Sequence, residues 1–137
     1  MADPSPIQPW WRRWFGTRSE RAAARFLKRL GYRIVARNYS CPLGELDIVA
    51  VDGGCVVFVE VRSTEQEDTV RTAASVDAAK QRRLTNLALH FLQKRRLLGH
   101  PARFDVLVVH WAAGSPLPLI DHHRNAFEAA GRFQVYS

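Results

Sequence analysis

Three features of the sequence predict an α/β fold in which helices flank a mixed β-sheet. Two segments repeat apolar residues at the spacing of an amphipathic helix. Four strand-like runs, rich in Val, Ile and Phe, lie between and after these segments. The pair Gly53-Gly54 separates two of the runs and is typical of a hairpin turn. The predicted order is α-β-β-β-α-β, and a crossover helix between the last two strands gives a mixed sheet.

The first predicted helix covers residues 17–31 and ends at Gly31, because glycine is common at helix C-termini. Its apolar residues recur at i, i+3, i+4 and i+7 and should face the core: Ala23, Phe26, Leu27 and Leu30. Basic residues recur on another face: Arg18, Arg21, Arg25 and Arg29. We therefore expect one face of this helix to pack on the sheet and another to present positive charge.

The later elements follow from the same periodicities. Strands are predicted at residues 32–38, 45–51, 55–62 and 103–111. The second helix is predicted at residues 76–97, and its inward residues are Val76, Leu84, Leu87, Ala88 and Phe91. The polar residues 63–75 are predicted to be a mobile loop. After a break at Gly114-Ser115-Pro116, a short edge strand is expected at 117–121 and a final helix at about 123–131.

The length of 137 residues suits one domain with a hydrophobic core. Residues 1–15 are predicted to be a flexible aromatic-basic tail, because three of the first nine residues are proline. Residues 16–137 are predicted to form the single domain. The tail carries the cluster Trp10–Phe15, which could stack on bases, lie at a membrane interface, dock on a partner or pack on its own domain.

The composition limits the partners and the compartment. A formal net charge of +7 and an isoelectric point of about 10.2 favour a polyanionic partner, either nucleic acid or an anionic membrane surface. No apolar run approaches the ~20 residues that cross a bilayer, so stable membrane insertion is not expected. The N-terminus lacks the features of a signal peptide. Cys41 and Cys55 are too few for a disulfide scaffold and lack metal-finger spacing, so a reducing cytoplasmic location is predicted.

Two acidic residues fall at strand positions that would normally be apolar. If Gly53-Gly54 forms a two-residue turn, Asp47 lies opposite Glu60 and Glu45 lies opposite Arg62. Opposed side chains on one sheet face have Cβ atoms about 5 Å apart, and two such carboxylates repel unless a cation or a proton lies between them. Mg²⁺ or Mn²⁺ would suit these oxygen ligands. Arg62, on the same face as Glu60, could stabilise charge on a phosphate, so the residues match the needs of a metal-dependent phosphodiesterase.

Ordinary structural roles are open for the same side chains. Asp47 and Glu60 could lie on a solvated sheet face, where ion pairs of Arg62 would contribute about 0–1 kcal/mol. Glu20 could complete a capping box at the start of the first helix or point toward the acidic pair. Lys80 could extend to solvent or reach a charged site.

A resemblance follows from the acidic residue before the hairpin and from Glu60-x-Arg62 after it. This pattern resembles the PD-(D/E)XK nuclease motif, whose superfamily shares the restriction-endonuclease-like αβββαβ core with archaeal Holliday-junction resolvases. More closely, residues 16–130 resemble the bacterial YraN-like family of uncharacterised proteins, which are predicted endonucleases. The shared segments are Gly16-x-x-x-Glu20-x-x-Ala23, Gly31-Tyr32, Arg37-Asn38-Tyr39, Gly44-Glu45-Leu46-Asp47, Phe58-Val59-Glu60-Val61-Arg62, Lys80, Arg103-Phe104-Asp105-Val106 and Ala126-Phe127.

The resemblance implies a metal-dependent endonuclease that acts on structured or branched nucleic acid, with DNA favoured over RNA. It implies Mg²⁺ or Mn²⁺ bound by Asp47 and Glu60, with Glu20 as a further acidic site residue. It places Arg62 where the superfamily has a catalytic lysine, and arginine is a poor base. It is compatible with a homodimer.

Binding residues are expected on the basic face of the first helix and on the second helix: Arg18, Arg21, Arg25 and Lys80. Two other functions remain open from the residues. One is a nucleic-acid-binding module of the same fold without hydrolysis, and the other is an adaptor that docks through Trp10–Phe15. Metal dependence separates the first from a nuclease, and deletion of the tail separates the second.

Overall fold

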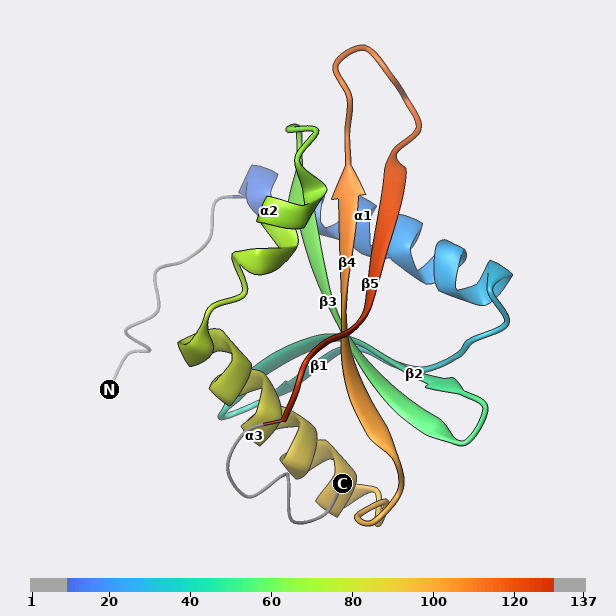
Figure 1. Cartoon of the computed structure of the whole chain (residues 1–137), viewed down its shortest axis with the longest axis vertical. Helices are drawn as coiled ribbons and strands as arrows, with labels where there is room; N and C mark the ends of the chain where they lie inside the picture. The colour runs from blue at the N-terminus through green and yellow to red at the C-terminus, as the bar shows by residue number, and fades with distance from the viewer. Residues whose placement is uncertain (1–9, 130–137) are drawn as a thin grey trace.

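The computed structural model of the chain describes the backbone of residues 10–129 and the side chains of residues 18–129. Figure 1 shows the elements, which follow one another in the order α1 (Trp10–Arg29), β1 (Arg33–Cys41), β2 (Gly44–Asp52), β3 (Cys55–Thr64), α2 (Thr69–Ala74), α3 (Ala78–Lys94), β4 (Ala102–His110) and β5 (Leu119–Phe127). The predicted αβββαβ core is confirmed, with α2 added before α3. The edge strand expected at 117–121 is present as β5, which is longer and extends to Phe127.

The strands form one five-stranded sheet in the order β1-β2-β3-β4-β5. Strands β3 and β4 are parallel, and every other neighbouring pair is antiparallel. Helices α2 and α3 make the connection from β3 to β4, as a parallel pair requires. The predicted α/β fold with a mixed sheet is therefore correct.

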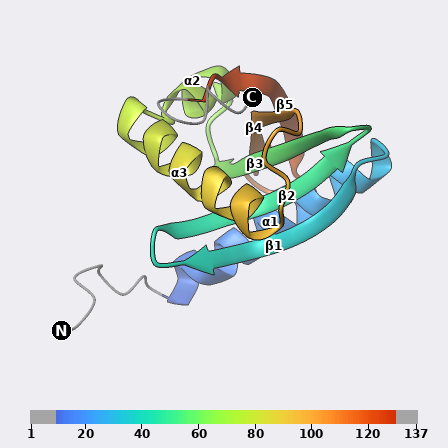
Figure 2. The same ribbon diagram turned by 90° about the horizontal axis from the view of Figure 1, so that it is seen from below.

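Helices α1 and α3 lie on opposite faces of the sheet, which thus separates two hydrophobic cores (Figure 2). On the α3 face, the Phe58 ring lies 5.9 Å from the Phe91 ring and 5.6 Å from the Phe104 ring, measured between centroids. On the α1 face, Leu27 packs with Ile48 and other fully buried residues of the strands. Burial on both faces explains why the middle strands are almost continuously apolar.

Helix α1 begins at Trp10, not at residue 17 as the sequence predicts. Pro9 is the last residue that would break a helix, and the chain after it is rich in good helix formers. Thr17 therefore lies inside α1, which leaves the second alternative for Glu20, a carboxylate that points toward the acidic pair. Leu30 was expected to face inward but is 51% exposed, because α1 ends at Arg29 and the chain turns at Gly31 with a φ of +93°.

Two other expectations were wrong. Residues 63–75 contain α2, whose first turn is capped by Asp68, because this side chain accepts a hydrogen bond of 2.9 Å from the Arg71 amide. The final helix is absent from the described residues, since β5 continues to Phe127 along the edge of β4. The Phe127 ring stacks on Phe104 with 4.8 Å between centroids, a contact that the spacing of apolar residues alone does not reveal.

Candidate active site

The candidate site lies where β2 and β3 separate (Figure 1). The ladder between them runs from Asp52↔Cys55 to Ile48↔Val59, the register that the Gly53-Gly54 turn predicts. Beyond this point β3 continues its pairing with β4 alone, up to Thr64↔His110, whereas β2 continues with β1. The fork leaves room between the strands at the next step of the register, which is occupied by Asp47 and Glu60.

Asp47 is anchored at this fork through its side chain. Its Oδ2 accepts a hydrogen bond of 2.9 Å from the backbone amide of Val61. This side-chain bond links β2 to β3 just beyond the point where their backbone hydrogen bonds end. Burial raises the pKa of Asp47 well above its usual range, and the neighbouring Glu60 carboxyl raises it further by its charge and by a hydrogen bond. The hydrogen bond from the Val61 amide lowers the pKa of Asp47, but by less than burial and Glu60 raise it.

Helix α1 and the first hairpin add two more carboxylates. One carboxylate oxygen each from Glu20, Glu45 and Asp47 lie within 4.8 Å of one another. The Asn38 side chain hydrogen-bonds Glu20, and Asn38 has a φ of +52° that asparagine tolerates better than most residues. Burial raises the pKa of Glu20, and the nearby charge of Glu45 adds to this effect, although the Asn38 bond favours the charged form. The cluster therefore holds more negative charge than its surroundings stabilise.

Glu60 joins this cluster to a pair of cations. Its side chain is only 7% exposed, and its Oε2 lies 3.1 Å from Arg62 Nη2 and 3.5 Å from Lys80 Nζ. Arg62 follows on the same strand, whereas Lys80 comes from the first turn of α3. That turn is positioned by Asp77, whose side chain accepts a hydrogen bond of 2.8 Å from the Lys80 amide. Among the described residues, Arg62 Nε is buried without a hydrogen-bond partner, so the guanidinium retains a donor for another acceptor.

The residue set fits a hard divalent cation. Carboxylate oxygens are the ligands that Mg²⁺ and Mn²⁺ prefer, and three such groups converge from α1 and β2. Burial, and to a smaller extent the neighbouring carboxylates, raise the pKa values of Asp47 and Glu20, and a bound cation would favour their charged forms. Glu60 lies beside Asp47, but its carboxylate already contacts two cationic side chains. If Glu60 binds a metal, its carboxylate must therefore be shared between the metal and these two side chains.

The structure brings together the predicted residues Glu20, Asp47, Glu60, Arg62 and Lys80. It adds Glu45, which the sequence pairs with Arg62, and Asn38, which belongs to a shared family segment but had no predicted role in the site. The alternation Glu45-x-Asp47 along β2 was the one available hint that Glu45 joins Asp47.

The predicted basic residues of α1 lie beside this site but do not act alike. Arg21 and Arg25 are exposed on the outer surface of α1. Arg18 instead lies over Trp111, with 4.1 Å between its Cζ and the ring centroid. The indole Nε1 of Trp111 donates a hydrogen bond of 2.9 Å to Ser19 Oγ, which also contacts Ser63 Oγ. Arg18 thus takes part in packing α1 against β4.

A second buried polar cluster surrounds Asp105 on the α1 face of the sheet. The Asp105 side chain accepts hydrogen bonds from His122 Nε2 at 2.8 Å, Arg103 Nε at 3.0 Å and the Asn125 amide at 2.9 Å. Burial opposes its charge, but these hydrogen bonds prevail and lower the pKa of Asp105. All of these partners belong to the protein itself, and Asp105 therefore acts as a structural anchor.

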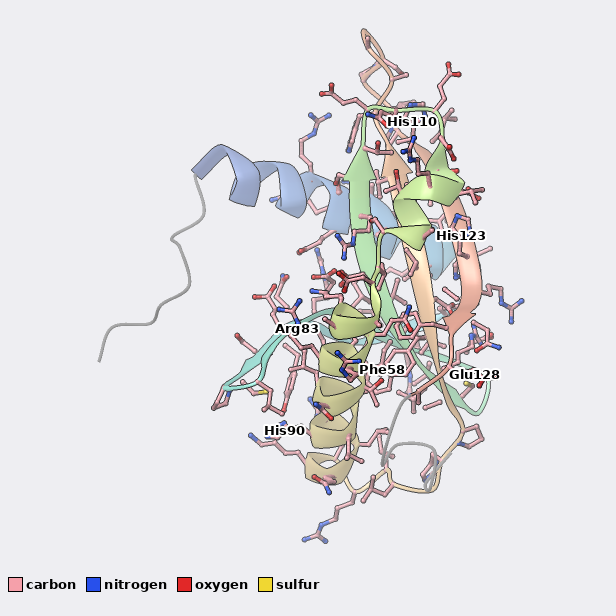
Figure 3. The ribbon with its side chains drawn as sticks, turned by 60° about the vertical axis from the view of Figure 1, so that its left-hand side comes forward. Phe58, Arg83, His90, His110, His123 and Glu128 are labelled. Atoms are coloured by element: carbon pink, nitrogen blue, oxygen red, sulfur yellow. The ribbon has the colours of Figure 1, made fainter. Side chains whose placement is uncertain are left out.

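The five histidines do not converge on one site in the described structure. His122 contacts Asp105, whereas Nε2 of its neighbour His123 lies 3.1 Å from Asp121 Oδ2. Figure 3 shows His123 on β5 and His110 at the end of β4, both away from His90 on α3. Phe58, in the same view, lies between α3 and the sheet, and Arg83 lies on the outer side of α3.

Comparison with known proteins gives a consistent family. Residues 19–109 match the model of "Uncharacterised protein family UPF0102". A UPF0102 protein of Desulfosudis oleivorans is 42% identical over 118 residues, which cover 86% of this chain and 93% of the relative. One of Geotalea uraniireducens is 43% identical over 115 residues (84% and 90%), and one of Moorella thermoacetica is 48% identical over 98 residues (72% and 82%).

None of the helices described in the structure is both long and apolar enough to traverse a bilayer. The match to the family model covers every residue of the acidic and cationic site, from Glu20 in α1 to Lys80 in α3. On these grounds the chain belongs to the UPF0102 family, which is the YraN family that its motifs resemble.

Proposed function

We propose that this protein is a metal-dependent endonuclease that hydrolyses phosphodiester bonds in structured or branched nucleic acid, with DNA favoured over RNA. The observation that carries the proposal is the convergence of Glu20, Glu45 and Asp47 within 4.8 Å, next to a Glu60 that contacts two cations. Carboxylates for a divalent metal and cations for the phosphate are the two requirements of this chemistry.

The side chains divide into two groups by role. Glu20, Glu45 and Asp47 would hold Mg²⁺ or Mn²⁺, with Glu60 at the border of the cluster. The metal, when bound, would polarise the phosphodiester and activate a water as nucleophile. The Arg62 side chain is 32% exposed, so its guanidinium can donate to a phosphate oxygen. Lys80 lies near enough to contact the same phosphate.

Lys80 is a lysine close to the position at which the superfamily motif has lysine and this chain has Arg62. The superfamily motif has a lysine at the strand position of Arg62, and arginine effectively never releases a proton in proteins. Lys80 Nζ reaches Glu60 from α3, so a lysine ammonium is present beside the motif glutamate in spite of Arg62. General acid or base catalysis is therefore available from the helix.

Binding would rest on contacts with phosphates. The net charge of +7 favours polyanions, and the exposed Arg21 and Arg25 extend a positive surface along α1 from Glu20. Such contacts position a strand without reading its sequence. A substrate recognised by its shape, such as a branch or a flap, suits this mode of binding.

The test is Mn²⁺-dependent cleavage of labelled duplex, flap, four-way-junction and single-stranded DNA and RNA. Asp47→Ala/Glu60→Ala should abolish cleavage without loss of the fold. A matched control, Glu65→Ala/Glu67→Ala, removes two exposed carboxylates from the loop after β3 and should cleave normally. Full activity in Asp47→Ala/Glu60→Ala would show that the cleavage does not come from this site.

A second candidate is a nucleic-acid-binding module without hydrolysis. It is favoured by Arg62 at the lysine position and by Glu60, whose charge two cationic neighbours already offset. Such a module would bind equally well in EDTA, with an affinity that falls steeply with salt. Absence of cleavage on every substrate, with binding retained in Asp47→Ala/Glu60→Ala, would select this candidate.

A further inference from the structure

A cavity of about 280 Å³ lies beside the turn that joins β2 to β3, whereas Asp47 and Glu60 lie farther along the same strands. Its apolar walls come from β1, β2, β3, the end of α3 and the turn after it: Val35, Val51, Val56, Phe91 and Leu97. Its remaining lining includes the basic side chains of Arg33, Arg95 and His100. The volume is near the lower limit of about 300 Å³ for small-ligand pockets, so the cavity suits one compact group.

The chemistry of the cavity points to an anion joined to a flat apolar group. Arg33 and Arg95 are exposed, and among the described residues neither forms an ion pair with a carboxylate. The Cζ of Arg95 lies 5.0 Å from the centroid of the Phe91 ring, which is only 1% exposed, so the planar group that a ligand can reach there is the Arg95 guanidinium. Arginine guanidinium planes stack on unstacked bases, and arginine also binds phosphate.

The cavity and the acidic pair of Asp47 and Glu60 lie on the same two strands, β2 and β3. Val56 in the cavity and Glu60 at the cluster are four residues apart on β3, as are Val51 and Asp47 on β2. At about 3.3 Å per residue the two sites are about 13 Å apart. Stacked nucleotides rise about 3.4 Å each, so a strand crossing the acidic cluster would reach the cavity about four nucleotides away, or fewer where it is unstacked.

We propose that this cavity accepts one unstacked nucleotide of a bound nucleic-acid strand, with the base against Leu97 and the guanidinium plane of Arg95 and the phosphate at Arg33. The inference relies on the proposed function for its nucleic-acid partner but not for hydrolysis. It favours substrates with an unpaired nucleotide a few positions from the scissile phosphate, and so gives branched or single-stranded regions an advantage over regular duplex.

Two variants of the full chain, each with a matched control, test the cavity. Gly54 lines it, and a Cβ built there has no atom within 4 Å, so Gly54→Leu fills space that Gly54→Ala leaves largely open. Arg33→Ala/Arg95→Ala removes its charge, whereas Lys28→Ala/Arg71→Ala removes the same charge from exposed positions elsewhere. Thermal melts establish that all four fold.

Affinities are measured in EDTA for a labelled single-stranded oligonucleotide, for the same backbone without bases and for free dAMP. We expect Gly54→Leu and Arg33→Ala/Arg95→Ala to bind the oligonucleotide about 5-fold or more weakly than their controls. Gly54→Leu should bind the abasic strand as Gly54→Ala does. Equal affinities of variants and controls for the oligonucleotide, a loss in Gly54→Leu that is equal on both strands, dAMP binding as tight as the strand, or no binding at all would each overturn the proposal.

The cleavage assay separates this inference from the proposed function. If cleavage requires Asp47 but the cavity variants bind as their controls do, the proposed nucleotide pocket is wrong and the proposed nuclease activity is supported. If binding depends on the cavity but no substrate is cleaved, the nucleotide pocket is supported and the proposed nuclease activity is wrong.

Discussion

Lys80 Nζ lies 3.5 Å from Glu60 Oε2, although the two residues belong to different layers of the fold. Glu60 is on β3 and Lys80 is in the first turn of α3. The contact gives the motif glutamate a lysine partner from the helix while Arg62 occupies the strand position. The first prediction concerns this pair.

If Lys80 transfers a proton, Lys80→Arg should keep the positive charge and binding but reduce cleavage by about 10²–10⁴-fold. Lys80→Ala should reduce cleavage at least as much. Arg62→Lys in the Lys80→Arg background should restore part of the rate, because it returns a lysine to the strand position. Single-turnover rates with Mn²⁺, measured beside the dissociation constant, check this. Unchanged cleavage in Lys80→Arg would assign Lys80 to phosphate binding alone.

The acidic cluster should make metal-free stability fall as pH rises. Burial and the charge of Glu60 raise the folded-state pKa of Asp47 above its unfolded value near 3.8, so the folded state holds a proton that the unfolded state has released. This contribution is present below about pH 4 and is lost as pH rises through the raised pKa. Asp47→Asn should therefore have a higher melting temperature than wild type at neutral pH in EDTA, and a flatter pH profile.

Mn²⁺ should reverse this loss in the wild-type protein. A ligand at 100 times its dissociation constant stabilises the folded state by about 2.7 kcal/mol, and Asp47→Asn should lose most of that gain. Glu67→Gln changes an exposed carboxylate in the loop before α2 and serves as the control. Melting temperatures with and without Mn²⁺ measure the effect. An equal gain in wild type and Asp47→Asn would place metal binding elsewhere.

The buried carboxylate of Asp105 should matter for stability rather than for the chemistry. Asp105→Ala leaves Arg103 and His122 without their buried partner and should reduce the free energy of unfolding by about 3–5 kcal/mol. Arg124→Ala, which removes an exposed contact to Asp52, should cost no more than about 1 kcal/mol. Denaturant titration measures both values, and similar small losses would contradict the anchoring role.

The pH dependence of stability that Asp105 contributes should be opposite to that of Asp47. Its folded-state pKa is lowered, so its contribution is present above the unfolded pKa near 3.8 and is lost as pH falls through the lowered value. In Asp47→Asn, where the opposing effect is removed, stability should decline below about pH 4. Stability measured from neutral to acid pH tests this, and an Asp105→Asn variant should weaken the decline.

The basic surface of α1 should bind phosphates without sequence preference. Arg21→Ala/Arg25→Ala should weaken binding of all nucleic acids by similar factors and reduce the slope of log K against log salt by about 1 per lost contact. Arg71→Ala/Lys94→Ala removes the same charge from exposed positions on α2 and α3, outside this surface. Fluorescence anisotropy over a range of salt measures the slope. Equal slopes in the two double variants would show only a general effect of net charge.

Local patterns were sufficient for much of the fold. Gly53-Gly54 set the register of β2 and β3, and this register brought Asp47 and Glu60 together as expected. The spacing of apolar residues located α3 and its inward stripe, including Leu84 and Phe91. Both signals act over a few residues, where backbone geometry alone determines which side chains are neighbours.

Expectations failed where the outcome depended on distant partners. The sequence Ala126-Phe127 is compatible with a helix or a strand. It forms part of β5 because the chain pairs with the edge of β4 and the Phe127 ring stacks on Phe104. Glu20 fits a capping box, but α1 continues past it toward the N-terminus and turns the carboxylate to Asn38. Propensity is a weak prior when pairing and burial supply more free energy than the local preference.

The sequence by itself determined the α/β class, the order of the core elements, the register of the central hairpin and the acidic pair at its end. Only the tertiary structure decided that Glu45 joins Glu20 and Asp47, that Lys80 reaches Glu60 from α3, and that Arg33 and Arg95 line one cavity. The first set depends on periodicity and turn geometry within short segments. The second depends on how α1 and α3 pack across two faces of the sheet, and a linear sequence pattern does not specify that arrangement.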